Sequence, residues 1–219
     1  MPLPRGARQR APVVLDRLRK EYGEPYCFLH HETPFQLLVA VILSAQCTDA
    51  KVNEVTPALF RRYGTPRKLA AAPREDVERL VYQTGFYRAK AKHIQETARI
   101  VVERYGGEVP RTMAELMTLP GVARKTANVV QAQCWGGAEG VCVDTHVKRV
   151  AYRLGLVSKD DPAAAEQDLM RVYPKEAWDD LPFFLIQHGR AVCDAKRPAC
   201  SRCLLADLCP RRGVTTRGG

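Results

Sequence analysis

The segment 118–126 (TLPGVARKT) combines residues that suit phosphate binding with a potential nucleophile. Pro120 and Gly121 favour a tight turn, and the next helix would present unpaired N–H groups beside it, where a phosphate can bind. Gly121, Val122 and Ala123 are therefore predicted to contact a nucleic-acid backbone in a helix-hairpin-helix. A plain turn between two helices is the alternative for so short a motif.

Lys125 falls in the first turn of the predicted second helix. The helix dipole disfavours a cation there by about 0.3–1 kcal/mol. With partial desolvation, this placement favours the neutral amine, whose lone pair can attack an electrophilic carbon. The alternative role is a lysine that only contacts phosphate.

A second candidate segment is 141–147 (VCVDTHV), beyond a glycine-rich stretch. Asp144 is expected at the N-cap of a helix, and capping alone would explain it. A carboxylate that accepts helix N–H groups can also stabilise positive charge developing on a sugar. Lys125 and Asp144 could then face each other across a cleft, with His146 either lining the cleft or serving the structure.

Four of the eight cysteines lie within 17 residues, separated by six, two and five residues, and the other four are scattered. In a reducing compartment this clustering indicates a metal centre and not a disulfide framework. Zinc fits poorly because only one gap is Cys-x-x-Cys, whereas an iron–sulfur cubane tolerates uneven spacing. The predicted ligands are Cys193, Cys200, Cys203 and Cys209. Lys196 and Arg197, between the first two, are predicted to project outward as a phosphate clamp, with neutralisation of the cluster's negative charge as the alternative.

The chain has 219 residues, 46% of them hydrophobic, which predicts one or two globular domains. No stretch is apolar for long enough to span a membrane, and no secretory signal is apparent, so an intracellular compartment is expected. A net charge of +10 favours a polyanionic partner. Membrane-surface binding is disfavoured because no amphipathic basic helix is found. Six arginines lie in the two tails: Arg5, Arg8, Arg10, Arg211, Arg212 and Arg217.

Apolar residues recur at helical spacing along most of the chain, and no alternating strand pattern is found, which predicts an all-α fold of about ten helices. Thr112 and Glu115 form a capping-box pattern. Prolines are expected at helix starts and glycines at helix ends. These residues are Pro34, Pro162 and Pro182, and Gly23, Gly64, Gly106 and Gly107. Glycines within 135–140 would allow a crossover between two domains.

In order and spacing, these motifs resemble the endonuclease III family of base-excision repair. The similarity spans residues 11–210 and includes 34–41 (PFQLLVAV), 44–49 (SAQCTD), 143–146 (VDTH) and 188–190 (HGR). It implies a six-helix barrel domain over 27–137, with the helix-hairpin-helix. It also implies a domain that holds a [4Fe-4S] cluster, formed by 1–26 and 138–219.

The resemblance also implies roles for individual residues. Lys125 would be the nucleophile, Asp144 the carboxylate that supports the transition state, and Gln46 the side chain that fills the space left by a flipped nucleotide. Phe86 stands where the family usually has a leucine wedge, with a core aromatic as the alternative. Ala123 replaces the family's second hairpin glycine and should resist positive φ.

The implied activity is that of a bifunctional DNA N-glycosylase/AP lyase. It would remove oxidised pyrimidines and nick the strand by β-elimination through a lysine Schiff base. Its partner would be double-stranded DNA with damaged bases or abasic sites, and it would act as a monomer in the bacterial cytoplasm, at the nucleoid. A pyrimidine-dimer or mismatch glycosylase of the same fold stays open, as does a non-catalytic helix-hairpin-helix DNA-binding module.

Overall fold

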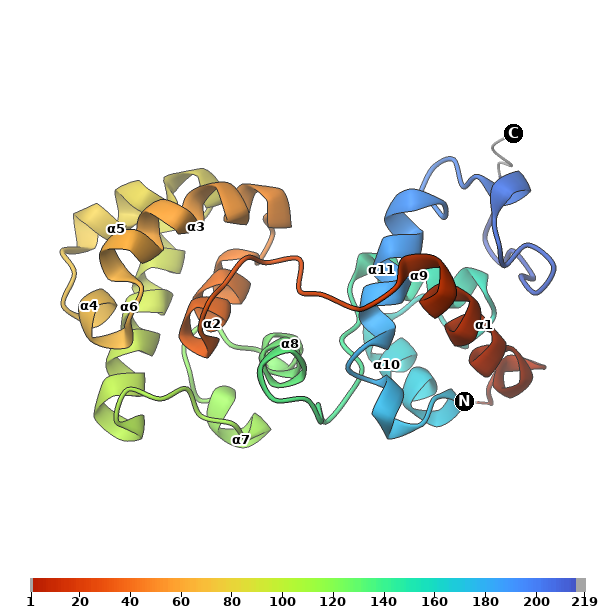
Figure 1. Cartoon of the computed structure of the whole chain (residues 1–219), viewed down its shortest axis with the longest axis horizontal. Coiled ribbons are helices and arrows are strands. Elements are labelled where there is room, and N and C mark those ends of the chain that lie inside the picture. The colour runs from red at the N-terminus through yellow and green to blue at the C-terminus, as the bar shows by residue number, and fades with distance from the viewer. Residues whose placement is uncertain (1, 216–219) are drawn as a thin grey trace. The chain divides into compact units, whose positions relative to one another are not determined.

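Residues 2–215 are described by a computed structural model of the chain, so Arg217 lies outside the described residues. The described part is helical throughout, with no strand, which confirms the predicted all-α class (Figure 1). The α-helices are α1 (Ala7–Tyr22), α2 (Pro34–Leu43), α3 (Asp49–Tyr63), α4 (Pro66–Ala70), α5 (Arg74–Val81), α6 (Tyr87–Tyr105), α7 (Met113–Leu116), α8 (Arg124–Cys134), α9 (Thr145–Arg153), α10 (Pro162–Val172) and α11 (Leu181–Ala191). Three short 3-10 helices are η1 (Tyr82–Thr84), η2 (Lys175–Ala177) and η3 (Cys200–Arg202).

The chain divides into two compact units. One unit, Cys27–Gly136, contains α2 to α8. The other combines residues from both ends of the chain, Met1–Tyr26 and Gly137–Gly219. The chain is anchored where it re-enters this second unit after Gly136. The backbone N–H groups of Gly137 and Ala138 both donate to the Asp179 carboxylate, at 2.7 and 3.0 Å.

Helix starts and ends follow local sequence signals. The Thr33 hydroxyl accepts from the N–H of Gln36 ahead of Pro34, and the Asp161 carboxylate accepts from Ala164 ahead of Pro162. These side chains satisfy N–H groups that have no partner within the helix. The predicted helix ends are confirmed at Gly23, Gly64 and Gly106, which are the C-cap residues of α1, α3 and α6.

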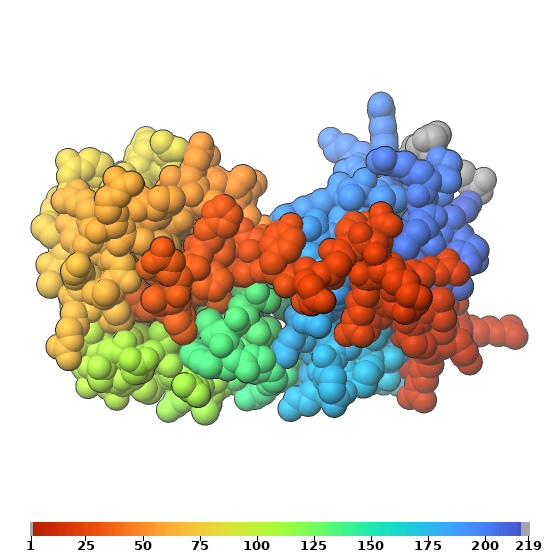
Figure 2. Space-filling model, in the orientation of Figure 1, coloured from red at the N-terminus to blue at the C-terminus, as the bar shows by residue number. Residues whose placement is uncertain are grey.

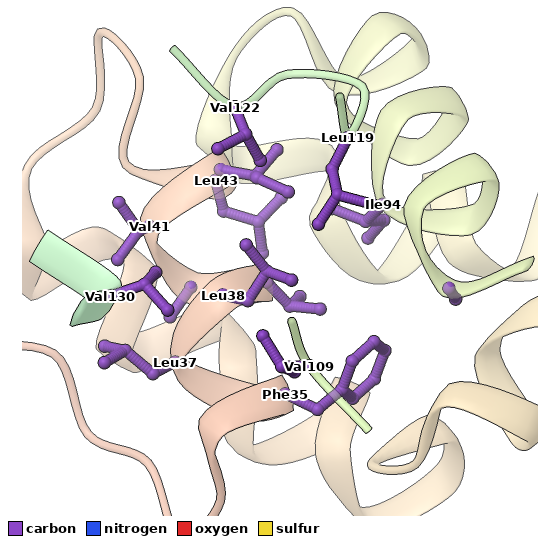
Figure 3. Close-up of a cluster of buried hydrophobic side chains, with 14 of the residues drawn as sticks. Phe35, Leu37, Leu38, Val41, Leu43, Ile94, Val109, Leu119, Val122 and Val130 are labelled. Carbon is purple, nitrogen blue, oxygen red and sulfur yellow. The ribbon is translucent and has the colours of Figure 1, made fainter. Parts of the chain in front are cut away.

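Helix α2 is the centre of the Cys27–Gly136 unit. Every residue from Phe35 to Leu43 is buried, and α3, α6 and α8 pack around this helix. Figure 3 shows Leu38 and Leu43 of α2 beside Ile94 of α6 and the hairpin residues Leu119 and Val122. Each fully buried Leu or Ile contributes about 1.5–3 kcal/mol of hydrophobic free energy. The hairpin is therefore built directly onto the core.

The other unit depends on packing between the two ends of the chain. Helix α1 packs against α10 and α11, and Figure 2 shows the red N-terminal region against the blue C-terminal one. Arg17 of α1 forms a bidentate ion pair with Asp207, at 2.6 and 2.9 Å, and donates a third bond to the Leu204 carbonyl. These contacts hold α1 beside the segment that carries the last cysteines.

Candidate active site and nucleic-acid interface

The turn between α7 and α8 is a tight hairpin held by its core contacts. The N-cap half of the predicted capping box is present, because the Thr112 hydroxyl accepts from the Glu115 N–H at 3.3 Å, while the Glu115 carboxylate accepts from that hydroxyl at 2.6 Å and not from the Thr112 N–H. Leu119 and Val122 are only 2% and 7% exposed. The Thr97 hydroxyl also donates to the Pro120 carbonyl at 3.0 Å. The backbone of the hairpin is thus fixed before any ligand binds.

Gly121 is required at its position for two reasons. Its φ is +79°, in the left-handed region that favours glycine. In addition, a Cβ there would lie 3.1 Å from the Ile42 side chain and 3.2 Å from the His93 ring. The close approach of this turn to α2 and α6 therefore means that Ile42 and His93 would have to shift to admit a Cβ.

Ala123 corrects an expectation from the sequence. Its backbone is extended, with φ −89° and ψ 170°, so alanine meets no positive-φ penalty at this position. Ala123 is the N-cap residue of α8, and no side chain caps that helix. N–H groups of the first turn that lack a side-chain cap can bind an anion such as a phosphate.

Lys125 is the second residue of α8 and is exposed. It has no ion pair or side-chain hydrogen bond among the described residues, and no acidic residue lies in the first turn of α8. The positive end of the helix dipole disfavours a cation here. The exposed amine is therefore available to an electrophile.

Asp144 is the N-cap of α9, as predicted from the sequence. Its Oδ1 accepts from the Val147 N–H at 2.8 Å, and the side chain is partly buried. The N-terminal end of a helix interacts favourably with a carboxylate. His146 has a structural position, because its Nδ1 lies 3.1 Å from Arg149 and its ring packs against Gly189. Asp144 and Lys125 belong to different units of the chain.

Gln46 and Phe86 share an unusual backbone conformation. With Arg211, they are the described non-glycine residues with positive φ, at +53° for Gln46 and +47° for Phe86. Both are exposed, and Phe86 retains 69% of its surface. The core-aromatic alternative for Phe86 is therefore wrong. Left-handed backbone costs such residues about 1–3 kcal/mol, and such strain clusters at functional sites.

The four clustered cysteines line a single cavity near the end of α11. Backbone N–H groups donate to the sulfurs of Cys203 and Cys209, each at 3.4 Å. No group of three or more His, Cys, Asp or Glu within residues 2–215 is arranged to hold a single metal ion. Four thiols around one cavity, with N–H groups directed at the sulfurs, fit a polynuclear iron–sulfur cluster better than one zinc ion.

The loop after Cys193 exposes both predicted clamp residues, Lys196 and Arg197. The Asp194 carboxylate accepts from the N–H groups of Lys196 and Arg197, at 2.8 and 2.9 Å. These backbone hydrogen bonds hold the pKa of Asp194 below its usual value. These bonds therefore hold the backbone of Lys196 and Arg197 in a defined turn.

Similarity to known proteins agrees with this geometry. A family model described as "HhH-GPD superfamily base excision DNA repair protein" matches residues 39–175. The chain is 54% identical over 203 residues to endonuclease III of Synechocystis sp., covering 93% of each protein. It is 40% identical to endonuclease III of Escherichia coli, covering 90% of this chain and 92% of that protein.

The chain belongs to the endonuclease III family. The predicted base-excision-repair DNA glycosylase/lyase class is thereby confirmed. A solved structure titled "Structure of a Trapped Endonuclease III-DNA Covalent Intermediate: Estranged-Adenine Complex" has a TM-score of 0.86 and 44% identity, covering 93% of this chain and 96% of that one. A thermostable thymine-DNA glycosylase shares the fold at 22% identity, with a TM-score of 0.80.

The sequence did not reveal which side chains contact the four clustered cysteines. The buried Arg153 donates to the Cys193 sulfur at 3.4 Å and to the carbonyls of Asp194 and Ala195. The His188 Nε2 lies 3.4 Å from the Cys203 sulfur, and its Nδ1 lies 3.1 Å from the Tyr22 hydroxyl.

Burial lowers the pKa of His188 to about 4, so its ring is neutral at pH 7. A neutral ring can accept from Tyr22 and donate to the cysteine sulfur. For Arg153, 40 residues from Cys193 along the chain, no local signal could have indicated this role. His188 lies in the 188–190 motif, but its partners come from distant segments.

Proposed function

We propose that the chain removes oxidised pyrimidines from double-stranded DNA and then nicks the strand at the abasic site, with Lys125 as the nucleophile. The observation that carries this proposal is the exposed Lys125 amine at the start of α8, without an acidic partner among the described residues. The uncapped helix start beside the Pro120–Gly121 turn would bind a phosphate of the same DNA strand.

The reaction would comprise base release and strand cleavage, followed by hydrolysis that frees the enzyme. The neutral Lys125 Nζ attacks C1′ of the damaged nucleotide, and the glycosidic bond breaks, so that its electron pair and a proton leave with the base. The C1′–O4′ bond then breaks as the Nζ electron pair forms the C=N bond, O4′ takes up a proton from water, and a protonated Schiff base between Nζ and C1′ results. Removal of a C2′ proton then allows the C3′–O bond to break, and the 3′ phosphate departs with that electron pair. Hydrolysis of the Schiff base restores the amine.

Asp144 is proposed to stabilise the positive charge that develops on the sugar as the base leaves. Its position as an N-cap supports this role, because the hydrogen bond from Val147 holds one carboxylate oxygen in place. Electrostatic groups that are fixed before the reaction stabilise a transition state without a reorganisation cost. The same carboxylate would assist the proton transfers.

Gln46 and Phe86 are proposed to stabilise the flipped-out nucleotide. Extrusion of a base costs a few kcal/mol of unstacking, so side chains that occupy the vacated space are needed. Exposed side chains on left-handed backbone suit this role, because they are accessible to DNA and such strain clusters at functional sites. Lys196 and Arg197 would contact phosphates of the same duplex.

We also propose that Cys193, Cys200, Cys203 and Cys209 hold a [4Fe-4S] cluster. When bound, this cluster would cross-link the C-terminal loops, and Arg153 and the N–H groups around the sulfurs would balance its negative charge. We expect about four iron atoms per chain and a brown protein. A colourless protein with stoichiometric zinc would contradict this assignment, and Cys203→Ser should lose iron.

The decisive experiment is borohydride trapping on duplexes that carry one lesion each. We expect a covalent adduct with wild-type protein, its loss in Lys125→Ala, and its retention in Lys68→Ala, which removes an exposed lysine of the same unit. DNA binding without adduct or scission would indicate the non-catalytic module. Base release from a thymine-glycol duplex, compared with mismatch and pyrimidine-dimer duplexes, tests the substrate class. Light scattering tests the proposed monomer.

The proposed place of action is the bacterial cytoplasm, at the nucleoid, because that is where genomic DNA is found in bacteria. Among the described residues, no helix has the length and apolarity that crossing a bilayer requires. Fluorescence microscopy of the tagged chain should show co-localisation with DNA. A membrane-associated signal would contradict this proposal.

A further inference from the structure

An open pocket of about 450 Å3 lies where the N-terminal segment, the turn after α9 and the chain beyond the last cysteine meet. We call it the arginine pocket. It is lined by Arg5, Arg10 and Arg212, by Gly155, Ser158 and Pro210, and by two prolines of the N-terminal segment. All of these residues belong to one compact unit. None of them belongs to the proposed catalytic residues or cysteine ligands.

Arg10 is held rigidly at the base of this pocket. Its Nη2 donates to the carbonyls of Arg5 and Gly155, at 3.0 and 2.8 Å. A Cβ at Gly6 would lie 2.9 Å from Arg10 Nη1, and one at Gly155 would lie 2.8 Å from Nη2. The Arg10 Nε is buried without a hydrogen-bond partner. The guanidinium is thus ordered, and its Nη1, which forms no hydrogen bond within residues 2–215, retains donor capacity.

Arg212 is held in a similar way on the other side of the pocket. Its two terminal nitrogens donate to the carbonyls of Val157 and Ser158, at 2.7 and 3.0 Å. The guanidinium also lies over the Tyr152 ring, 4.2 Å from its centroid. Carbonyl and aromatic partners position this group without neutralising its charge.

No acidic side chain lines the arginine pocket, and none of its three arginines forms an ion pair within residues 2–215. The Asp168 carboxylate, which accepts from the N–H and hydroxyl of Ser158, is itself paired with Arg171. Helix α1 starts here with no side-chain cap and no acid in its first turn, which adds positive potential. The pocket therefore holds about three uncompensated positive charges.

We propose that the arginine pocket binds a phosphate group. Guanidinium groups match phosphate oxygens with paired N–H donors, and two of the three are already ordered, so little entropy is lost on binding. The volume falls within the roughly 300–1,000 Å3 that is typical of small-molecule sites. The phosphate could belong to a DNA strand outside the lesion site or to a free oligophosphate.

Arg5 is the residue to change, because its side chain is exposed and has no partner within the described residues, so its removal should not disturb folding. Arg8→Gln is the matched control. Arg8 is an exposed arginine on α1, outside the pocket, and its replacement changes the net charge equally. Arg5→Gln removes the positive charge, and Arg5→Glu is a second variant that reverses it. Thermal unfolding verifies that all three variants are folded.

The free-phosphate arm uses inorganic pyrophosphate, titrated calorimetrically into the holoprotein. Arg5→Gln should weaken binding about two- to fivefold, as expected for one partly exposed charge, and Arg5→Glu should weaken it further. Arg8→Gln should leave the affinity unchanged. Bound pyrophosphate should also raise the unfolding temperature of wild type more than that of Arg5→Glu.

The DNA arm uses an undamaged duplex and measures affinity at several salt concentrations. If a strand phosphate occupies the pocket, Arg5→Gln should reduce the slope of log K against log salt by about 0.9, and Arg8→Gln should not. A change in the pyrophosphate arm alone assigns a free phosphate ligand, and a change in the DNA arm assigns a strand phosphate. Equal effects of Arg5→Gln and Arg8→Gln, or no effect in either arm, would overturn the proposal.

Discussion

The Nζ atom of Lys51 lies 3.2 Å from the Oε1 atom of Gln83, and this hydrogen bond connects the first turn of α3 with η1. Lys51 follows Gln46 by five residues, and Gln83 precedes Phe86 by three. The loops that carry the two exposed, left-handed residues are therefore neighbours in one unit. The two residues proposed to stabilise a flipped nucleotide therefore lie on adjacent loops of the same unit.

Comparing Phe86→Gly with Phe86→Ala separates the effect of the backbone strain on stability from the effect of the aromatic side chain on activity. Glycine relieves the left-handed strain at φ +47°, whereas Phe86→Ala retains it, so we expect Phe86→Gly to be up to about 1 kcal/mol more stable than Phe86→Ala. Both variants should release damaged bases at least about tenfold more slowly, because both lose the aromatic wedge. Urea unfolding and single-turnover base release measure the two effects. A Phe86→Gly protein less stable than Phe86→Ala would argue against the strain.

Asp144 combines a capping role with a proposed catalytic one, and two substitutions separate them. Asparagine caps helices as well as aspartate, so Asp144→Asn should unfold like wild type while turnover falls about 100-fold or more. Asp144→Ala should in addition lose about 0.5–2 kcal/mol of stability. Single-turnover kinetics beside denaturant unfolding distinguish the effects. Full activity in Asp144→Asn would contradict the catalytic role.

The hairpin offers a matched pair of substitutions with opposite steric consequences. Gly121→Ala should cost about 1–3 kcal/mol, because alanine resists φ +79° and its Cβ would crowd Ile42 and His93. DNA affinity should fall with it. Ala123→Gly should change stability little, because glycine is accepted at an N-cap at least as well as alanine, and it should bring no gain in affinity, since φ is already −89°. Tighter DNA binding by Ala123→Gly would show that the hairpin needs positive φ at this residue.

Asp76 should make the Cys27–Gly136 unit sensitive to acid. The hydrogen bond from the Tyr63 hydroxyl, at 2.6 Å, and the guanidinium groups of Arg79 and Arg62 hold the pKa of Asp76 below its usual value. A lowered folded-state pKa stabilises the fold above about pH 4, and this contribution is lost as the pH falls through the folded value.

Asp76→Asn should therefore lower the unfolding temperature at pH 7, and the difference from wild type should shrink below about pH 4. Glu75→Gln removes an exposed neighbouring carboxylate and serves as the control. Thermal unfolding from pH 3 to pH 7 gives the comparison. A pH-independent difference would mean that lost packing, and not the charge of Asp76, causes the effect.

Local sequence signals determined the helical elements and the types of chemistry. Thr112 with Glu115, and Asp144 before Val147, form the expected caps because capping bonds span three residues and depend little on the rest of the fold. The placement of Lys125 in the first turn of α8 follows from the preceding hairpin residues in the same way. The spacing of the cysteines could likewise be read directly.

Tertiary packing decided whatever depends on residues far apart in the chain. The exposure of Phe86 could not be read locally, because an aromatic residue before a helix suits a core as well as a surface. The extended backbone of Ala123 results from the way Leu119 and Val122 anchor the hairpin in the core. Arg10 and Arg212 line one pocket only because the two ends of the chain fold into one unit, and Arg153 reaches Cys193 across 40 residues of the C-terminal segment. Such contacts arise from burial and chain closure over many residues, for which no short motif carries a signal.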